Sequence, residues 1–196
     1  FIDSDLKNIN VIFIGNKVQN NLKFFPIDLR GLTGCLVFYK SNFENTNLKV
    51  QDSNCEDSLN LVGSTGNIDK IEIINSFSDG LDIDFSDLVI QNTIIRNSKN
   101  DCVDVSGGTY TFKNIDANSC GDKGLSVGEK TILELDNMNI ENSNIGVASK
   151  DGSVSSINKI KIKDVDICFS AYNKKQEFSG GQIKINKHSC SNFQKE

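Results

Sequence analysis

An apolar residue recurs every 22 positions through most of this chain of 196 residues. The recurring positions are Val37, Leu59, Leu81, Val103, Leu125, Val147 and Phe169. A fixed period of about 20–50 residues is typical of solenoid proteins, in which each repeat is one supersecondary unit that stacks on its neighbours. Residues one period apart then share a column in space, so the period predicts where any functional site would lie.

Apolar and polar residues alternate around each of these positions. Residues 78–84, for example, read Ser-Asp-Gly-Leu-Asp-Ile-Asp. Such alternation predicts a strand with one buried face. A second inward column comprises Leu61, Ile83, Val105 and Val127, and the outward column between the two comprises Asn60, Asp82, Asp104, Ser126 and Ala148. A slip by one residue would bury Asp82 and Asp104, so the register is strongly specified.

A second apolar run follows later in each repeat, as in residues 71–76 and 93–98. Asn75 and Asn97 are again 22 residues apart, and stacked asparagines suit turns because they tolerate left-handed backbone and bond to their neighbours. No long stretch shows helical periodicity. The pattern therefore predicts an all-β fold, a parallel β-helix (solenoid) with about 22 residues per coil that spans residues 34–190.

Both ends of the chain depart from the period. Residues 1–33 are expected to form an N-terminal coil and cap, with a strand at Val11-Ile-Phe-Ile and a loop or cap from Asn20 to Leu32. Terminal repeats are atypical in solenoids because they must cover an open apolar core. Residues 170–181 are an irregular insertion, after which Ile183 resumes the strand pattern. Residues 191–196 are expected to be a frayed C-terminal tail.

The composition excludes some classes of partner. The formal net charge is −5, Trp is absent and no basic stripe is visible, which argues against binding of nucleic acid. No apolar run is long enough to predict a transmembrane segment. The chain begins without Met and shows no signal peptide, so we interpret it as a mature form or as one domain of a larger parent chain.

Six cysteines fall into three pairs at about one period. Cys168 and Cys190 are 22 residues apart, while the other pairs, Cys35 with Cys55 and Cys102 with Cys120, are slightly closer in sequence. Neighbouring coils are about 4.8 Å apart, which is close to the range of a disulfide. Disulfides would indicate an exported protein, whereas the alternative is small apolar thiols in a reduced core. The single histidine, His188, is expected to have no functional role.

Acidic residues also follow the period. Asp57, Asp79 and Asp101 form one column, Asp82 and Asp104 a second with Asp84 beside them, and Glu56 and Asp122 a third. Like charges at this spacing raise one another's pKa or attract a cation. Two kinds of chemistry use such carboxylates: Ca²⁺ binding by oxygen ligands, and acid–base catalysis on a sugar. The alternative is that outward Asp and Lys residues only keep the sheet soluble.

On these motifs the chain resembles the pectate-lyase-like superfamily of right-handed parallel β-helices, across residues 34–190. The coils that read Ser78-Asp79-Gly80, Asn100-Asp101-Cys102, Gly121-Asp122-Lys123-Gly124 and Ala148-Ser149-Lys150 occupy the places of the catalytic motifs of polygalacturonase-type glycoside hydrolases. Asp79, Asp101 and Lys150 match those motifs, whereas the second Asp of the pair, the His and the Arg are absent. The segments from Gly121, Gly146 and Ala171 look more like bacterial β-helix repeat proteins without an assigned activity.

The resemblance and the acidic columns together predict a polysaccharide-associated domain that binds or processes a glycan along an acidic groove. The catalytic candidates are Asp79, Asp101, Lys123 and Lys150, the binding candidates are Asp57, Asp82, Asp84, Asp104 and Asp122, and the metal candidates, for Ca²⁺, are Asp79 and Asp101. In a lyase or epimerase, Lys123 or Lys150 would be the base.

Other functions remain open from the sequence. A lyase, an epimerase, a hydrolase and a non-catalytic glycan-binding domain all fit the groove, and the binding domain would stack sugars on Tyr39, Tyr110, Tyr172 or some of the phenylalanines. The alternative is a non-catalytic structural or assembly module of a larger bacterial surface protein. We expect an extracellular or cell-surface location in either case.

Overall fold

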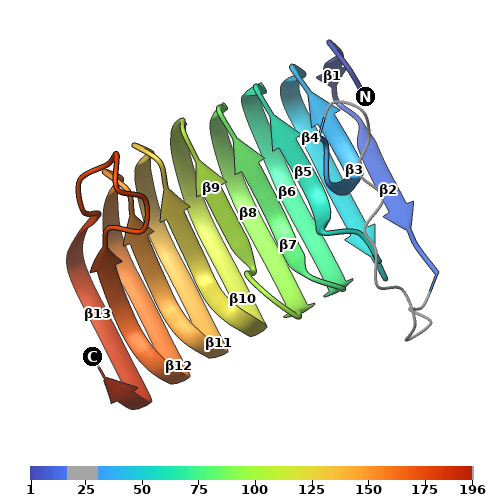
Figure 1. Ribbon diagram of the computed structural model, residues 1–196. Helices are drawn as coiled ribbons and strands as arrows, with labels where there is room; N and C mark the ends of the chain where they lie inside the picture. The colour runs from blue at the N-terminus through green and yellow to red at the C-terminus, as the bar shows by residue number, and fades with distance from the viewer. Residues whose placement is uncertain (17–30, 196) are drawn as a thin grey trace.

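The computed structural model describes residues 1–16 and 31–195, and in these residues the protein is all-β without a helix. Its parallel strands stack into a β-solenoid of about 6 turns whose coils are about 22 residues apart, as Figure 1 shows. The strands are β1 (Asp5–Lys7), β2 (Asn10–Ile14), β3 (Gly34–Tyr39), β4 (Asn42–Gln51), β5 (Asp57–Val62), β6 (Thr65–Ser76), β7 (Asp79–Asp84), β8 (Asp87–Ser98), β9 (Val103–Ser106), β10 (Thr109–Gly128), β11 (Ile132–Lys150), β12 (Val154–Tyr172) and β13 (Gln182–Lys195). The predicted β-helix is therefore confirmed.

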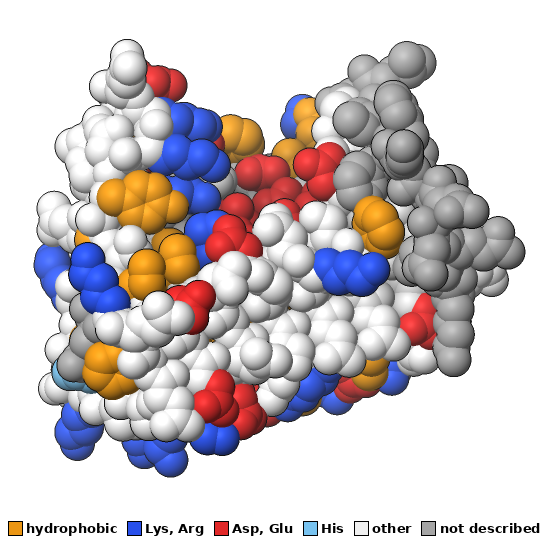
Figure 2. All heavy atoms as spheres, turned by 60° about the horizontal axis from the view of Figure 1, so that its bottom comes forward, with side chains coloured by type: hydrophobic (Ala, Val, Ile, Leu, Met, Phe, Trp, Pro, Cys, Tyr) orange, Lys and Arg blue, Asp and Glu red, His pale blue; other side chains and the backbone are white. Residues whose placement is uncertain are grey.

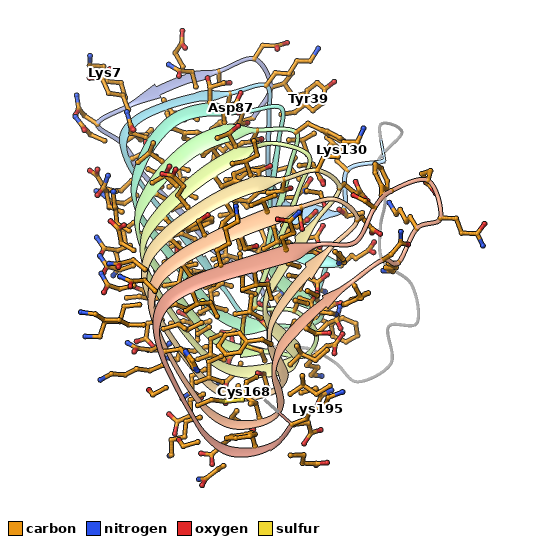
Figure 3. All side chains as sticks on the ribbon, turned by 90° about the vertical axis from the view of Figure 1, so that its left-hand side faces the viewer. Lys7, Tyr39, Asp87, Lys130, Cys168 and Lys195 are labelled. Atoms are coloured by element: carbon orange, nitrogen blue, oxygen red, sulfur yellow. A yellow bond between two sulfur atoms is a disulfide. The ribbon has the colours of Figure 1, made fainter. Side chains whose placement is uncertain are left out.

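Two faces of each coil matter for function. The aspartate face consists of β3, β5, β7 and β9 and of the ends of the next three strands, residues 123–128, 145–150 and 167–172. The asparagine face consists of residues 47–51, 70–74, 92–96, 114–118, 137–141, 159–163 and 187–191. Inward side chains of both faces meet in one core, so the two faces lie on opposite sides of it. Figure 3 shows this arrangement along the solenoid axis.

The predicted inward columns form the core of the aspartate face. Leu59, Leu81, Val103 and Leu125 are fully buried and follow one another in register. The first member of the column is different from the prediction: Leu36 pairs with Leu59, whereas Val37 pairs with Asn60 and is partly exposed. The reason is the turn after β4, which has one residue more than the corresponding turn of the next coil.

The corner after the asparagine face is a ladder of residues with left-handed backbone. Asn75 and Asn97 have φ values of 61° and 62°, and the Asn97 side-chain amide donates to Asn75 Oδ1 over 3.1 Å. Asn75 in turn donates to Asp52 Oδ1 over 2.7 Å. The predicted role of these asparagines at a stacked turn is confirmed, because a short amide side chain both tolerates the backbone and links the coils.

All six cysteines form disulfides, and the pairs are those that the period suggested. They are Cys35–Cys55, Cys102–Cys120 and Cys168–Cys190. Of the two readings that the spacing left open, the cross-linked one is therefore correct. Cys120 follows the asparagine face and Cys102 begins the aspartate face, so their disulfide ties the corner between the two faces.

The first and last coils extend the solenoid. β2 pairs in parallel with β4, which confirms an earlier coil at Val11-Ile-Phe-Ile. The cap or loop expected from Asn20 to Leu32 lies almost entirely outside the described residues. The irregular insertion is present between β12 and β13, and β13 runs to Lys195, where a frayed tail was expected. Within the described ranges, no helix is long and apolar enough to cross a membrane.

Candidate functional site

The outward side chains of the aspartate face form three parallel columns. The first comprises Asp57, Asp79, Asp101 and Lys123; the second comprises Asn60, Asp82, Asp104, Ser126 and Ala148; the third comprises Tyr39, Val62, Asp84, Ser106, Gly128, Lys150 and Tyr172. Figure 2 shows acidic side chains gathered at the bottom of a hollow, with Lys and Arg side chains beside them. The fold therefore brings eight of the nine predicted site residues into these columns, and the ninth, Asp122, lies beside them and is paired with Lys123.

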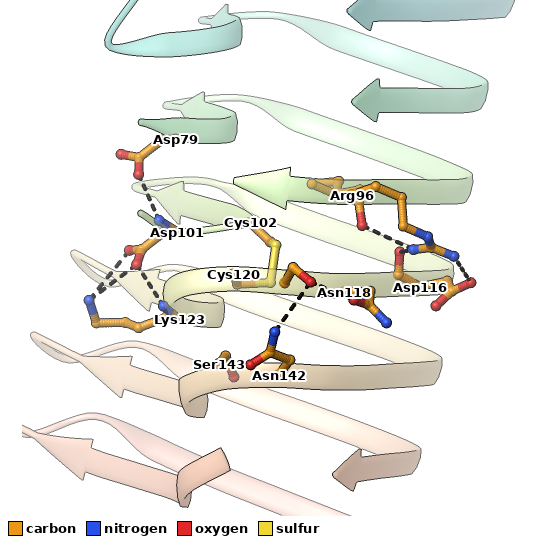
Figure 4. Close-up of a disulfide and its surroundings, with 12 residues drawn as sticks. Asp79, Arg96, Asp101, Cys102, Asp116, Asn118, Cys120, Lys123, Asn142 and Ser143 are labelled. Atoms are coloured by element: carbon orange, nitrogen blue, oxygen red, sulfur yellow. Dashed lines mark hydrogen bonds and ion pairs between the residues drawn. A yellow bond between two sulfur atoms is a disulfide. The ribbon is translucent and has the colours of Figure 1, made fainter. Parts of the chain in front are cut away.

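The first column is built from hydrogen bonds between coils. Asp79 Oδ1 accepts from the backbone N–H of Asp101 over 2.8 Å and from the Asn100 side-chain amide over 2.7 Å. Asp101 Oδ1 accepts from the backbone N–H of Lys123 over 3.0 Å, as Figure 4 shows. Asp79 and Asp101 each hold the backbone of the following coil, which is a structural role whatever else they do.

Lys123 ends the first column. Its ammonium lies 3.3 Å from Asp101 Oδ1 and also pairs with Asp122. Burial opposes the charge on Lys123, but the hydrogen bonds and charges of Asp122 and Asp101 raise its pKa above its usual range. Lys123 is therefore protonated at neutral pH, and it supplies a positive charge to the site.

Burial dominates the electrostatics of the carboxyl groups in the hollow. It raises the pKa of Asp57 and of Asp101 to about 7, although Thr33 and Lys123 oppose the rise at the two positions. Burial also raises the pKa of Asp79 and Asp84, and it raises that of Asp82 well above its usual range, with a further rise from the neighbouring carboxylates. These groups hold protons at a pH at which exposed aspartates are ionised.

Lys150 belongs to the third column, next to Tyr172, and its side chain reaches back towards the second column. It is buried, and its ammonium donates to Ser126 Oγ over 2.8 Å and lies 3.7 Å from Asp104 Oδ2. Gly128 makes room for it, because a Cβ at this position would lie 3.0 Å from Lys150 Cε. Asp104 Oδ1 is buried and has no hydrogen-bond partner among the described residues. Lys150 thus supplies the positive charge nearest to Asp104.

Aromatic side chains border the hollow. Tyr39 and Tyr172 stand at the two ends of the third column, and both are partly exposed. Six coil spacings of about 4.8 Å separate them, which is about 29 Å. Phe85, which follows Asp84 at the rim, is 66% exposed. Tyr110 was also expected to stack on sugars, but this is wrong: it is fully buried, and its hydroxyl donates to Ser106 O.

The insertion 173–181 stands at the C-terminal end of the hollow and is tied to the coil below it. Asp151 Oδ1 accepts from the backbone N–H groups of Lys174 and Lys175 over 2.8 and 2.7 Å. Burial opposes the charge on Asp151, but these two donors hold its pKa below its usual range. The Lys130 ammonium lies over the Phe178 ring. These contacts make the insertion a fixed wall of the site.

The predicted metal site has a weak geometric basis. The described residues contain no group of three or more His, Cys, Asp or Glu side chains arranged to hold a metal ion. Asp79 Oδ1 and Asp101 Oδ1 also have other partners, since both accept backbone N–H groups and Asp101 faces Lys123. Ca²⁺ at Asp79 and Asp101 therefore stays a prediction.

Comparison with protein-family models, with curated proteins and with solved structures finds no match to this chain. The resemblance to the pectate-lyase-like superfamily thus depends only on the motifs in the sequence. The site has to be interpreted from its own geometry.

Some parts of the site were not foreseen from the sequence. The contact of Lys150 with Ser126 crosses a whole coil, and the role of Gly128 follows from that contact. The 22-residue period does place Ser126, Gly128 and Lys150 on adjacent outward columns. Small residues beside a lysine that follows the 22-residue period are the sequence signal that would have revealed this buried position of Lys150.

Proposed function

We propose that the aspartate face binds an extended polysaccharide that runs along the solenoid axis. The observation that carries this proposal is the third column, in which partly exposed tyrosines stand about 29 Å apart at the ends of a floor of small and charged residues. Sugar rings stack on aromatic faces, and hydroxyl groups accept and donate hydrogen bonds to carboxyl and ammonium groups. A chain of several sugar units fits that length.

Binding is better supported than catalysis. Two of the catalytic candidates, Asp79 and Asp101, already bond to the backbone of the next coil, and Lys123 is held protonated by Asp122 and Asp101. A lysine that abstracts a proton has to be deprotonated first. If the domain is catalytic, the remaining acid–base groups are Asp82, Asp84 and Asp104, with Lys150 as the neighbouring positive charge. Whether it would act as a lyase, epimerase or hydrolase stays open.

Aromatic stacking provides the test. The double variant Y39A/Y172A is expected to bind oligosaccharides at least about tenfold more weakly than the wild type, because it loses the stacking surface at both ends. The matched control Y39F/Y172F keeps both rings and is expected to bind within about threefold of the wild type. Affinities are measured by calorimetry on neutral glucan, polygalacturonate and amino-sugar oligomers. Equal binding by the alanine variant would contradict the proposal.

A structural module is the second candidate function. It is favoured by the three disulfides and by the coil-to-coil hydrogen bonds of the aspartates. It predicts that no oligosaccharide of the panel binds and that no reducing ends or unsaturated products are released. The disulfides also support an extracellular or cell-surface location, since they persist in oxidising compartments.

A further inference from the structure

The asparagine face changes its charge pattern towards the C-terminus. In its earlier coils, basic side chains are paired with acids: Lys49 and Lys70 contact Glu72, and Arg96 contacts Asp116. In the last two coils, four of the six outward positions are lysines: Lys159, Lys161 and Lys163 on β12 and Lys187 on β13. Lys163 contacts Glu141 and Asp164. We name the exposed residues Lys159, Lys161 and Lys187 the lysine patch. None of the three forms an ion pair within residues 1–16 and 31–195.

The lysine patch interrupts a favourable ladder. Asn92, Asn114 and Asn137 stack in one column, where the side-chain amides of Asn114 and Asn137 each donate to the preceding asparagine over 3.4 Å. The next two members of this column are Lys159 and Lys187, which are directly opposite one another. Like charges at directly opposite positions destabilise a sheet. Lys159 and Lys187 therefore repel each other at two positions where asparagines would form a hydrogen bond between coils.

Protection of a sheet edge explains only part of this pattern. Lysines on an edge strand discourage pairing with other chains, and Lys187 lies on β13, which pairs with β12 and with no other described strand. Lys159 and Lys161, however, lie on β12, which is paired on both sides by β11 and β13. Their charges therefore need another counterpart.

We propose that the lysine patch docks a linear anionic polysaccharide, which runs along β12 and β13 across the solenoid axis. The backbone positions of these lysines are spaced by about 6.6 Å along a strand and about 4.8 Å between strands, so that their side chains present a cluster of charge to a row of carboxylate or sulfate groups. A flat anionic bilayer fits less well, because it would also meet Asp116, Asp136 and Glu141, whose side chains are 46–49% exposed on the preceding coils. A narrow chain over Lys159, Lys161 and Lys187 ends before Lys163, whose ammonium is paired with Glu141 and Asp164.

The test removes three charges from the patch and three from elsewhere on the same side. The variant K159S/K161S/K187S is expected to bind dextran sulfate and polygalacturonate about tenfold more weakly than the wild type, with binding that also weakens as salt rises. The matched control K49S/K70S/K113S loses the same charge from lysines that are already paired with Glu72 and Asp136, and it is expected to bind like the wild type. The variant K159R/K161R/K187R keeps the charge and is expected to retain binding.

Any of three results would overturn the inference. The first is that the wild type binds neither polyanion, and the second is that K159S/K161S/K187S and K49S/K70S/K113S lose binding equally. The third is that vesicles with phosphatidylserine bind while the soluble polymers do not. Neutral dextran serves as the uncharged probe. The inference is independent of the hollow, because the patch variant keeps Tyr39 and Tyr172 and should bind any neutral oligosaccharide of the aspartate face as the wild type does.

Discussion

The two faces of the solenoid place similar carboxylates in opposite electrostatic states. On the asparagine face, the Lys49 and Lys70 ammonium groups hold the pKa of Glu72 below its usual range. On the aspartate face, Asp101 also has a lysine partner, yet burial raises its pKa to about 7. The Glu72 side chain is 20% exposed and that of Asp101 is 4% exposed.

The difference shows whether burial or ion pairing decides the protonation state of each carboxyl group. Water and two ammonium groups solvate the charge of Glu72, so the ionised form is favoured. Asp101 has little water, one lysine and the neighbouring carboxyl groups of Asp104 and Asp79, so the neutral form is favoured. A single lysine does not compensate for burial among other acids. Figure 4 shows the corner that separates these two regimes, with the disulfide between Cys102 and Cys120 at its centre.

Removal of the disulfide at this corner should lower the stability of the fold more than any of the other substitutions. The variant C102A/C120A removes a cross-link between residues 18 apart in sequence, and we expect it to lower the free energy of unfolding by about 3 kcal/mol. For a chain of this size, that corresponds to a fall in Tm of about 6–12 °C in thermal denaturation followed by circular dichroism. A change below about 2 °C would show that the two faces hold together without the cross-link.

The pH dependence of stability should follow the aspartate face. Asp57 and Asp101 have folded-state pKa values of about 7, above the ordinary value of 3.8, so the folded state binds protons more tightly than the unfolded state. The resulting stabilisation is complete below about pH 3.8 and is lost as the pH rises through about 7. We therefore expect the free energy of unfolding to fall by about 2 kcal/mol for each of the two groups, about 4 kcal/mol together, between about pH 5.5 and pH 8. A Tm that rises over this interval would contradict the assignment.

Single charge removals should have opposite signs on the two faces. At about pH 8, D82N is expected to stabilise the fold by about 1–2 kcal/mol, because it removes a buried carboxyl group whose neighbours are also acidic. E72Q is expected to destabilise it by at most about 0.5 kcal/mol, because it loses partly exposed ion pairs. Urea unfolding at two pH values measures both. The gain from D82N should shrink at about pH 5, and a gain that is independent of pH would exclude the electrostatic explanation.

Much of this arrangement could be predicted from the periodic positions alone. The columns of Asp79 with Asp101 and of Asp82 with Asp104 follow from counting residues, because stacked coils of equal length place equivalent residues above one another. The count fails where a coil has a different length, as the shift from Val37 to Leu36 shows. It also could not distinguish bonded from free cysteines, since both suit a position one coil apart.

The 22-residue period does not predict side-chain contacts between different columns. The expected exposure of Tyr110 was an error of interpretation, because Tyr110 alternates with Thr109 and Thr111 and stacks in register with the buried Leu88 and Leu133. Lys150 reaches back over Gly128 to Ser126 and Asp104, and the direction of a long side chain is set by packing and not by spacing.

The sequence by itself determined the coil, the register of its columns and the face on which the acids gather. The physical reason is that alternation and period follow from backbone geometry, which is local and repeats. Only the tertiary structure decided which acids are buried and protonated, which lysines neutralise them and which lysines have no partner. Those properties depend on water exclusion and on distances between side chains of different coils, which no count along the chain contains.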